Sequence, residues 1–280
     1  MRGWVDNFIS QHRLASAGAR GSFDDLKFAV ADAAALTAEF GRHVGSNRFF
    51  PDGRLTQKTD AEAARAKLLA DLAELKKPGR TKATDLLVVF VAGHGAVVGD
   101  DRAGKAVLAV DGVKGLKNPR LVFCCNDFDV SKPAATSVAA AELFDALAEV
   151  NCRKVVLLDV CHAGQALEQN VIRRFLPGDH GPLVLAACEA REQSFEHPAL
   201  RHGLFTAALL EAVGPDRRAY KDGALTARGL AEYVKGRVPQ MCREIGGGEK
   251  GDEVKRVQNP IEYLPLHADT VLMRTVRGGG

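Results

Sequence analysis

Residues 86–95 read Leu-Leu-Val-Val-Phe-Val-Ala-Gly-His-Gly, and this stretch decides the fold. It opens with an apolar run rich in β-branched side chains, and a glycine ends that run. A second stretch of the same design, residues 154–164, reads Lys-Val-Val-Leu-Leu-Asp-Val-Cys-His-Ala-Gly. Apolar runs that are continuous rather than alternating are typical of strands covered on both faces, as in a parallel sheet. Both stretches therefore predict buried strands, one ending beside a histidine and the other beside a cysteine.

Further strands and helices surround these two stretches. The apolar runs Leu121–Cys125 and Leu183–Ala187 predict two more buried strands. Segments with apolar residues at helical spacing separate most of the strands. The predicted helices are Asp24–Phe40, Asp60–Lys77, Ser137–Val150, Leu204–Val213 and Thr226–Val238. Thr59 and Glu62 have the spacing of a capping box at the start of the second helix. Strands that alternate with helices predict an α/β fold, with a mostly parallel β-sheet and helices on both faces.

Three stretches depart from this alternation. Val97–Gly115 is rich in glycine and charge, and Lys105–Asp111 within it predicts a small hairpin. Gln165–Pro182 joins the third and fourth predicted strands and contains glycine, proline and two adjacent arginines. At the start of the chain, Met1–Ser10 has a few apolar residues interrupted by polar ones, which is only a weak strand pattern.

Length and composition limit the class of protein. The 280 residues suit a single domain with one sizeable core. Positive and negative charges nearly cancel, leaving a formal net charge of +3, so nucleic acid is not an expected partner.

The longest apolar run, Leu86–Ala92, is too short to span a membrane, and Asp6 interrupts any signal-peptide core. The six cysteines have no paired CxxC spacing. A reducing compartment is therefore expected, and we predict a soluble cytoplasmic protein.

The ends of the two quoted strands carry reactive side chains. Ligands of open α/β sheets bind at the carboxyl ends of the strands, so His94 and Cys161 are expected to face one cleft. A thiol becomes an effective nucleophile beside a base that takes its proton. Alone, such a histidine is usually held by a nearby carbonyl, and a buried cysteine is usually inert. A metal centre formed by Cys161, His162 and His94 would lack a clear fourth ligand. No glycine-rich phosphate loop is present, which disfavours a nucleotide-binding enzyme.

Several motifs together resemble one known family. Ala-Gly-His-Gly at 92–95 and Asp-Val-Cys-His-Ala-Gly at 159–164 resemble the His-Gly and Asp-x-Cys-His-Ser-Gly signatures of caspase-like cysteine peptidases, especially metacaspases and their bacterial relatives. Ala163 replaces the usual serine. Further segments resemble the family in the same order along the chain: Leu26–Ala33, Ala187–Ser194, Gly203–Glu211 and Gln258–Pro260. The resemblance covers roughly residues 24–264 and implies a single caspase-like domain over 1–280. Its large-subunit-like part would span about 1–170 and its small-subunit-like part about 182–266.

The resemblance implies a role for each matching residue. Cys161 would attack the scissile carbonyl, and His94 would protonate the leaving amine. The backbone amides of Gly95 and Cys161 would hold the oxyanion. Asp32 and Asp159 match the acidic residues of the primary specificity pocket in metacaspases, so cleavage after Arg or Lys is expected. Caspases proper have Gln where Asp159 stands and cut after Asp. Without the resemblance, Asp32 is an exposed helix residue and Asp159 is a strand-end carboxylate that caps a loop.

The resemblance also bears on regulation and partners. Gln165–Pro182 lies where family members often cut themselves, so Arg173 or Arg174 is a candidate autoprocessing site. No cofactor is required for the chemistry. Calcium dependence is not expected, because residues 135–137 (Ala-Thr-Ser) replace the acidic pair of calcium-dependent members, although Asp127 and Asp129 lie nearby. The partners would be a protein or peptide substrate and an activating protein or domain on another chain. By analogy the peptidase would act in bacterial stress or defence. The alternative is a catalytically silent scaffold or sensor on the same fold.

Overall fold

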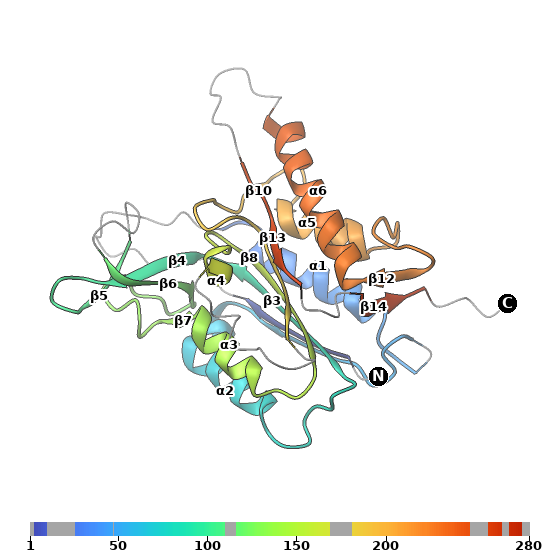
Figure 1. The fold of residues 1–280 in the computed structure, drawn as a ribbon, viewed down its shortest axis with the longest axis horizontal. Helices are drawn as coiled ribbons and strands as arrows, with labels where there is room; N and C mark the ends of the chain where they lie inside the picture. The colour runs from blue at the N-terminus through green and yellow to red at the C-terminus, as the bar shows by residue number, and fades with distance from the viewer. Residues whose placement is uncertain are drawn as a thin grey trace.

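The structure is a computed structural model that describes residues 3–9, 26–46, 48–109, 116–168, 181–246, 257–264 and 269–275. Its centre is a six-stranded sheet, drawn with the helices around it in Figure 1. In spatial order the strands are β13 (Ile261–Tyr263), β9 (Leu183–Ala186), β8 (Arg153–Val160), β3 (Leu86–Gly93), β1 (Gly3–Ile9) and β2 (Arg54–Lys58). Every neighbouring pair is parallel except β13 with β9, which is antiparallel. The predicted α/β fold with a mostly parallel sheet is confirmed.

The continuous apolar strands are buried because both faces of the sheet are covered. All eight residues of β3 are buried, and alternate residues enter two different cores. Leu86, Val88 and Phe90 pack on the side of α1 (Ala29–Gly41), α5 (Leu204–Val213) and α6 (Ala227–Gly246). The residues between them pack on the side of α2 (Arg65–Leu75), α3 (Ala140–Ala148) and α4 (Gln165–Glu168). This alternation follows from the two-residue period of a strand, and it decides which side chains face the site.

The apolar run Leu121–Cys125 is buried and most of it forms a strand, as predicted, but that strand does not belong to the central, mostly parallel sheet. It lies in β6 (Lys117–Cys124), within a separate four-stranded antiparallel sheet. The other strands of that sheet are β4 (Gly95–Asp100), β5 (Ala106–Leu108) and β7 (Ser137–Ala139). Val122 and Cys124 of the run enter the small core of this sheet. Leu121, Phe123 and Cys125 pack instead in the core on the side of α2 and α3. A short apolar run indicates that a strand is buried, but it does not indicate to which sheet the strand belongs. The hairpin expected inside Lys105–Asp111 forms instead between β4 and β5.

Helix starts also differ from the sequence predictions. The predicted helix Asp60–Lys77 is a 3-10 turn, η1 (Asp60–Ala63), followed by α2 from Arg65. Thr59 makes no side-chain cap, so the predicted capping box is wrong. Tertiary contacts fix the start of α2: the Arg65 backbone N–H donates to Asp127 Oδ1 at 3.1 Å, and its guanidinium donates to both oxygens of Glu142. Two other helices begin later than predicted, at Ala29 for α1 and at Ala140 for α3, where β7 takes the first residues.

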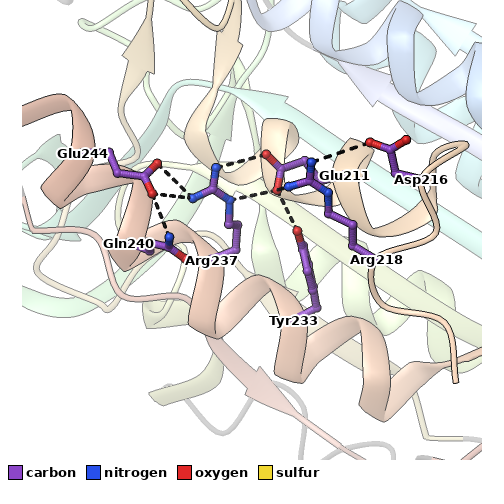
Figure 2. A network of polar contacts seen from close by, with 7 residues as sticks. All are labelled: Glu211, Asp216, Arg218, Tyr233, Arg237, Gln240 and Glu244. Carbon is purple, nitrogen blue, oxygen red and sulfur yellow. Dashed lines mark hydrogen bonds and ion pairs between the residues drawn. The ribbon is translucent and has the colours of Figure 1, made fainter.

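A polar network joins α5 to α6 on the outer side of the helical layer (Figure 2). The Glu211 carboxylate accepts hydrogen bonds from Arg237 at 2.8 and 3.2 Å and from the Tyr233 hydroxyl at 2.7 Å. Arg237 also donates to Glu244, and Arg218 forms an ion pair with Glu211 at 3.5 Å. Partial burial would raise the pKa of Glu211, but the bonds from Arg237 and Tyr233 outweigh it and lower the pKa. An ionised Glu211 therefore holds α6 against α5, whose first turn borders the site.

Two short antiparallel pairs complete the fold: β10 (Glu196–His197) with β11 (His202–Gly203), and β12 (Ala224–Thr226) with β14 (Val271–Arg274). In the part of the chain that the structure describes, no helix combines the length and the apolar character needed to cross a membrane.

Candidate active site

The strand register brings the two predicted reactive residues to the same end of the sheet. Gly93 of β3 lies opposite Val160 of β8, so His94 and Cys161 follow at neighbouring positions. The Cys124 backbone N–H donates to the His94 carbonyl oxygen at 3.0 Å, which fixes the chain where it leaves β3 for β4. His94 is buried, with 8% of its surface exposed, whereas Cys161 is half-buried. The parallel register therefore places a thiol and an imidazole that lie far apart in the sequence at one sheet edge.

The Cys161 thiol is protonated in this environment. Burial raises the pKa of Cys161, and the negative charges of Asp159 and Glu196 raise it further. The thiol donates a long hydrogen bond to the Ser194 carbonyl oxygen, with an Sγ···O distance of 3.9 Å. A thiolate is the nucleophilic form of cysteine, so this residue needs a base to become reactive. His94, which follows the neighbouring strand, is the candidate for that base.

Gly95 lies so close to Cys161 that no side chain fits. A Cβ atom built on Gly95 would stand 2.2 Å from the Cys161 carbonyl oxygen and 3.1 Å from the Val160 side chain. The nearest of these atoms is backbone, which a small rotamer change does not move. The glycine after His94 therefore permits a backbone contact between the two strand ends.

We expect Gly95→Ala to destabilise the fold by about 2 kcal/mol or more, as overpacking of a tight site does. The matched control is Gly236→Ala on α6, where an added Cβ meets nothing within 4 Å. That change should stabilise the protein by about 0.5–1 kcal/mol, because alanine favours a helix interior. Urea unfolding of the two variants beside wild type measures both effects. Equal stability of Gly95→Ala and wild type would contradict the contact.

His162 is not among the residues that line the cleft beside Cys161. Its backbone has a positive φ of 60°, its N–H donates to the Glu192 carbonyl at 3.0 Å, and its Nδ1 lies 3.2 Å from the Ala190 carbonyl. Across the described residues, no group of three or more His, Cys, Asp or Glu side chains is arranged to hold a metal ion. Asp127 accepts a hydrogen bond from the backbone of Arg65, and Asp129 accepts two from Ser131. None of the six cysteines, all of which lie in the described residues, forms a disulfide.

Asp32 and Asp159 come together beside Cys161. Asp32 lies in the first turn of α1 and Asp159 near the end of β8, and Gly203 separates them. A Cβ built on Gly203 would lie 3.0 Å from Asp159 Oδ2 and 3.3 Å from Asp32 Oδ2. Both carboxyl groups are buried, with 2% and 7% exposure respectively. The expectation that these two residues share a site agrees with this geometry, whereas the reading of Asp32 as an exposed helix residue is wrong.

Most of the hydrogen bonds to the carboxyl oxygens of Asp32 and Asp159 come from uncharged donors. Asp159 accepts hydrogen bonds from the hydroxyls of Ser194 and Thr206, both at 2.6 Å. Asp32 accepts the Gly203 N–H at 3.1 Å and lies 2.6 Å from His202 Nδ1. Within the described residues, neither carboxyl has a lysine or arginine partner.

The electrostatics of the pair favour protonation. Burial raises the pKa of Asp159 to about 7, and the neighbouring Asp32 contributes to the rise. Burial also raises the pKa of Asp32, against the opposing hydrogen bonds from His202 and Gly203. Two buried carboxylates repel each other and lose their hydration, and beside Asp32 only the His202 imidazole, 2.6 Å away, opposes this effect with charge. Such a site gains stability when a positive charge enters it.

Glu196 is a third carboxylate at the site, and the sequence reasoning missed it. It lines the same cleft, and its oxygens accept the backbone N–H groups of Lys27 and Phe28 at 2.8 and 2.9 Å, just before α1. Its charge raises the pKa values of Asp159 and Cys161. Glu196 lies two positions after the family-like segment Ala187–Ser194, but it belongs to no motif from which a role in the site could be predicted.

The cleft between the carboxyl pair and Cys161 is narrow in this conformation. Leu26, Phe195, Glu196 and Gly203 are among its walls, and its free space amounts to about 20 Å³. That volume holds about one water molecule. An arginine or lysine side chain therefore needs the walls to move apart before it can reach the carboxyl pair.

Gln258 holds the loop that carries Ser194. It is buried with 1% exposure, and its Oε1 accepts the Phe195 N–H at 3.0 Å. Its Nε2 donates to the Ala187 carbonyl at 3.1 Å and to Ser194 Oγ at 3.2 Å. Ser194 in turn contacts Asp159 through its hydroxyl and Cys161 through its carbonyl. Gln258 is therefore a positioning residue for both halves of the site.

We expect Gln258→Met, which keeps the side-chain length but removes all three bonds, to lower kcat/KM for a substrate by about 10- to 100-fold, since a displacement of about 1 Å has effects of this size. Gln240→Met on the exposed face of α6 is the matched control and should leave kcat/KM unchanged. Thermal unfolding of each variant measures how much stays folded at the assay temperature. A fully active Gln258→Met protein would show that the loop needs no such support.

Comparisons with known proteins agree with this architecture. A family model described as the caspase domain matches residues 20–273. Among solved structures, the chain is similar to protein GSU0716 from Geobacter sulfurreducens, with a TM-score of 0.59 and 17% identity, over 94% of this chain and 93% of that one. It is also similar to caspase-1 from Spodoptera frugiperda, with a TM-score of 0.51 and 12% identity, over 94% and 86% of the two chains. No curated protein matches the chain in sequence. At such identities the structural likeness shows the fold alone.

Proposed function

This chain belongs to the caspase domain family, and from that premise we propose that it is a cysteine endopeptidase that cleaves proteins after arginine or lysine. The family match confirms the resemblance inferred from the motifs. The observation that carries the proposed specificity is the buried pair Asp32 and Asp159, which lies beside Cys161 without a lysine or arginine partner in the described residues.

The proposed chemistry begins with the protonated thiol. His94 takes the proton from Cys161 Sγ, and the thiolate attacks the scissile carbonyl carbon. The resulting oxyanion would be held by the backbone N–H groups of Gly95 and Cys161, an interaction worth about 3 kcal/mol per donor in comparable sites. His94 then gives its proton to the leaving amine, which departs and leaves an acyl group on sulfur. Water, deprotonated by His94, hydrolyses the acyl group and restores the thiol. No metal is needed for these steps.

The proposed specificity follows from charge. A guanidinium or ammonium group entering between Asp32 and Asp159 would replace lost hydration and favour the ionised form of both carboxyls. Arginine has the advantage over lysine, because its planar fork presents parallel donors to two acceptors. Glu196 adds a third negative charge at the same cleft. An aspartate side chain would meet three carboxyl groups, so cleavage after Asp is not expected.

The narrow cleft supports a role for activation. With about 20 Å³ free, the cleft must open for a basic side chain to enter. An activating protein or domain on another chain would act by moving the walls near Phe195 and Leu26. We expect calcium to have no effect on cleavage. A cytoplasmic role in bacterial stress or defence is proposed by analogy with the family.

Arg173 and Arg174, the candidate autoprocessing site, lie outside the described residues. Self-cleavage there follows from the proposed basic specificity. We expect the intact mass of the wild-type chain to split at one of these arginines during incubation, while Cys161→Ala stays whole. An unchanged wild-type mass under conditions where an external arginine peptide is cleaved would contradict autoprocessing and leave the peptidase intact.

The experiment that tests the function is hydrolysis of matched fluorogenic peptides that end in Arg, Lys or Asp, with and without calcium. Cleavage after Arg and Lys but not Asp is expected. Cleavage after Asp alone would keep the thiol chemistry and overturn the carboxyl-pair specificity. A catalytically silent scaffold is the competing function, which the closed cleft also fits. An arginyl chloromethyl ketone separates the two, because a peptidase would be labelled at Cys161 and a scaffold would not.

A further inference from the structure

A second cavity lies where α1 and α5 end. Its free space amounts to about 490 Å³, and its lining includes Arg42, His43, Arg48 and Arg217. Glu39, Val213, Gly214 and Pro215 complete the walls. A volume of this size is in the range of small-ligand sites. The cavity shares no residue with the cleft at Cys161.

The cavity is positively charged. Among the described residues of its lining, three are arginines and one, Glu39, is acidic. Glu39 forms an ion pair with Arg42 at 3.3 Å. The positive charges of Arg48 and Arg217 are therefore not balanced by Glu39. Burial lowers the pKa of His43, and the charges of Arg217, Arg48 and Arg42 lower it further. All three cations therefore stand near one imidazole, which stays neutral at pH 7.

The guanidinium groups of Arg48 and Arg217 have no acidic partner within the part of the chain that the structure describes. Among the described residues, no carboxylate or other acceptor bonds to either guanidinium. Like charges gathered in this way repel each other and are stabilised by an anion between them.

The two arginines stand on anchored backbone. The loop that carries Arg48 is closed by hydrogen bonds from Gly45 N–H to the Phe50 carbonyl at 3.1 Å and from Phe50 N–H to the His43 carbonyl at 2.9 Å. Phe50 itself is buried, with 2% exposure. Arg217 has a positive φ of 52°, unfavourable for a long side chain, and its N–H donates to the Gly214 carbonyl at 3.0 Å. Side chains on backbone held in this way lose less freedom on binding a ligand.

We propose that this cavity binds a small anion that carries phosphate, with at least two negative charges. Arginine forks match phosphate oxygens in pairs, and two arginines with no acidic partner among the described residues favour a ligand of that charge. The site is separate from the proposed catalytic cleft, because Asp32 and Arg42 stand at opposite ends of α1, about 15 Å apart along the helix axis. A ligand here would contact the ends of both helices.

Isothermal titration with pyrophosphate, a nucleoside diphosphate and succinate tests the proposal on the full chain. The test variant is Arg48→Ala with Arg217→Ala. The control is Arg102→Ala with Lys132→Ala, which removes the same charge from exposed positions outside the cavity. We expect wild type to bind pyrophosphate with a Kd below about 0.1 mM and the test variant to bind at least about tenfold more weakly, as the loss of charge-assisted bonds predicts. The control should stay within about twofold of wild type.

The outcomes separate clearly. Equal affinity for pyrophosphate and the nucleoside diphosphate would mean that phosphate alone is recognised, and tighter binding of the nucleotide would mean that the rest of the cavity holds the nucleoside. Both support the site. The proposal is overturned by no binding of either phosphate ligand at about 1 mM, which is weak on any affinity scale. It is also overturned by equal weakening in the test and control variants, or by succinate binding more tightly than pyrophosphate. Circular dichroism of each variant shows whether it is folded.

Discussion

Replacing Cys161 with alanine is expected to abolish hydrolysis of a fluorogenic peptide that ends in arginine, with kcat/KM falling by at least about 10³-fold. The reason is that the variant has no atom to attack the scissile carbonyl, whereas His94, Gly95 and the carboxyl pair remain in place. The Cys161 side chain is only half-buried, and its one hydrogen bond is a long contact with the Ser194 carbonyl. Its loss should therefore change the stability of the fold little.

The matched control for this prediction is Cys242→Ala on α6. Cys242 is buried and forms no disulfide, and it lies in the core between the helices and the sheet, outside the cleft lining. Its truncation leaves a small cavity that lowers stability by about 1–2 kcal/mol, but hydrolysis per folded molecule should stay at the wild-type rate. If Cys161→Ala and wild type cleave the peptide equally, the nucleophile lies elsewhere or the activity belongs to a contaminant. Labelling by the chloromethyl ketone, located by peptide mass, then identifies the thiol that reacts.

The strand ends that carry the candidate site could be predicted from the sequence because they follow strong local patterns. His94 and Cys161 each end a continuous apolar strand, and the rule that ligands gather at the carboxyl ends of strands places them together. Asp159 lies in β8 and Cys161 directly follows that strand, two residues later, so the two-residue period of a strand predicts that both point to one face. For Asp32, burial beside Asp159 was inferred from family resemblance alone. Its helix gives no hint that a residue of the first turn would be 2% exposed.

The supporting residues could not be predicted in the same way. Gln258 reaches Ser194 across 64 positions of sequence, and Glu196 bonds the backbone ahead of α1 across 168 and 169 positions. Single polar residues in loops carry no periodicity, so only the folded chain shows what they contact. The same holds for β6, whose apolar residues match those of a central strand although antiparallel partners hold them in another sheet. Local sequence patterns predict which residues are buried. They do not predict which strands pair with each other, because strand pairing depends on the whole fold.

Replacing Asp159 with asparagine is expected to lower kcat/KM for arginine and lysine peptides by about 10²- to 10³-fold, since a buried ion pair with the substrate is lost. Asparagine has nearly the same shape, and the hydroxyls of Ser194 and Thr206 can rotate to accept from its amide. Fluorogenic peptide assays give kcat and KM separately, and the loss should fall mainly on KM. Asp269→Asn, which changes an exposed carboxylate, is the control and should leave both constants unchanged.

The pH dependence of the same variant gives a second, independent test. Asp159 in the folded protein has a pKa of about 7, against an ordinary value of 3.8. Between these values the folded chain binds more protons than the unfolded chain, so the free energy of unfolding should fall as pH rises from about 4 to 7. Over the upper part of that range kcat/KM for arginine peptides should rise, because the pocket must be ionised to bind a cation.

Asp159→Asn should show a shallower fall in stability and be more stable than wild type at pH 8. If the stability of the variant depends on pH as that of wild type does, Asp159 is already ionised in the free protein. The proposal that a basic substrate side chain drives its ionisation would then be wrong.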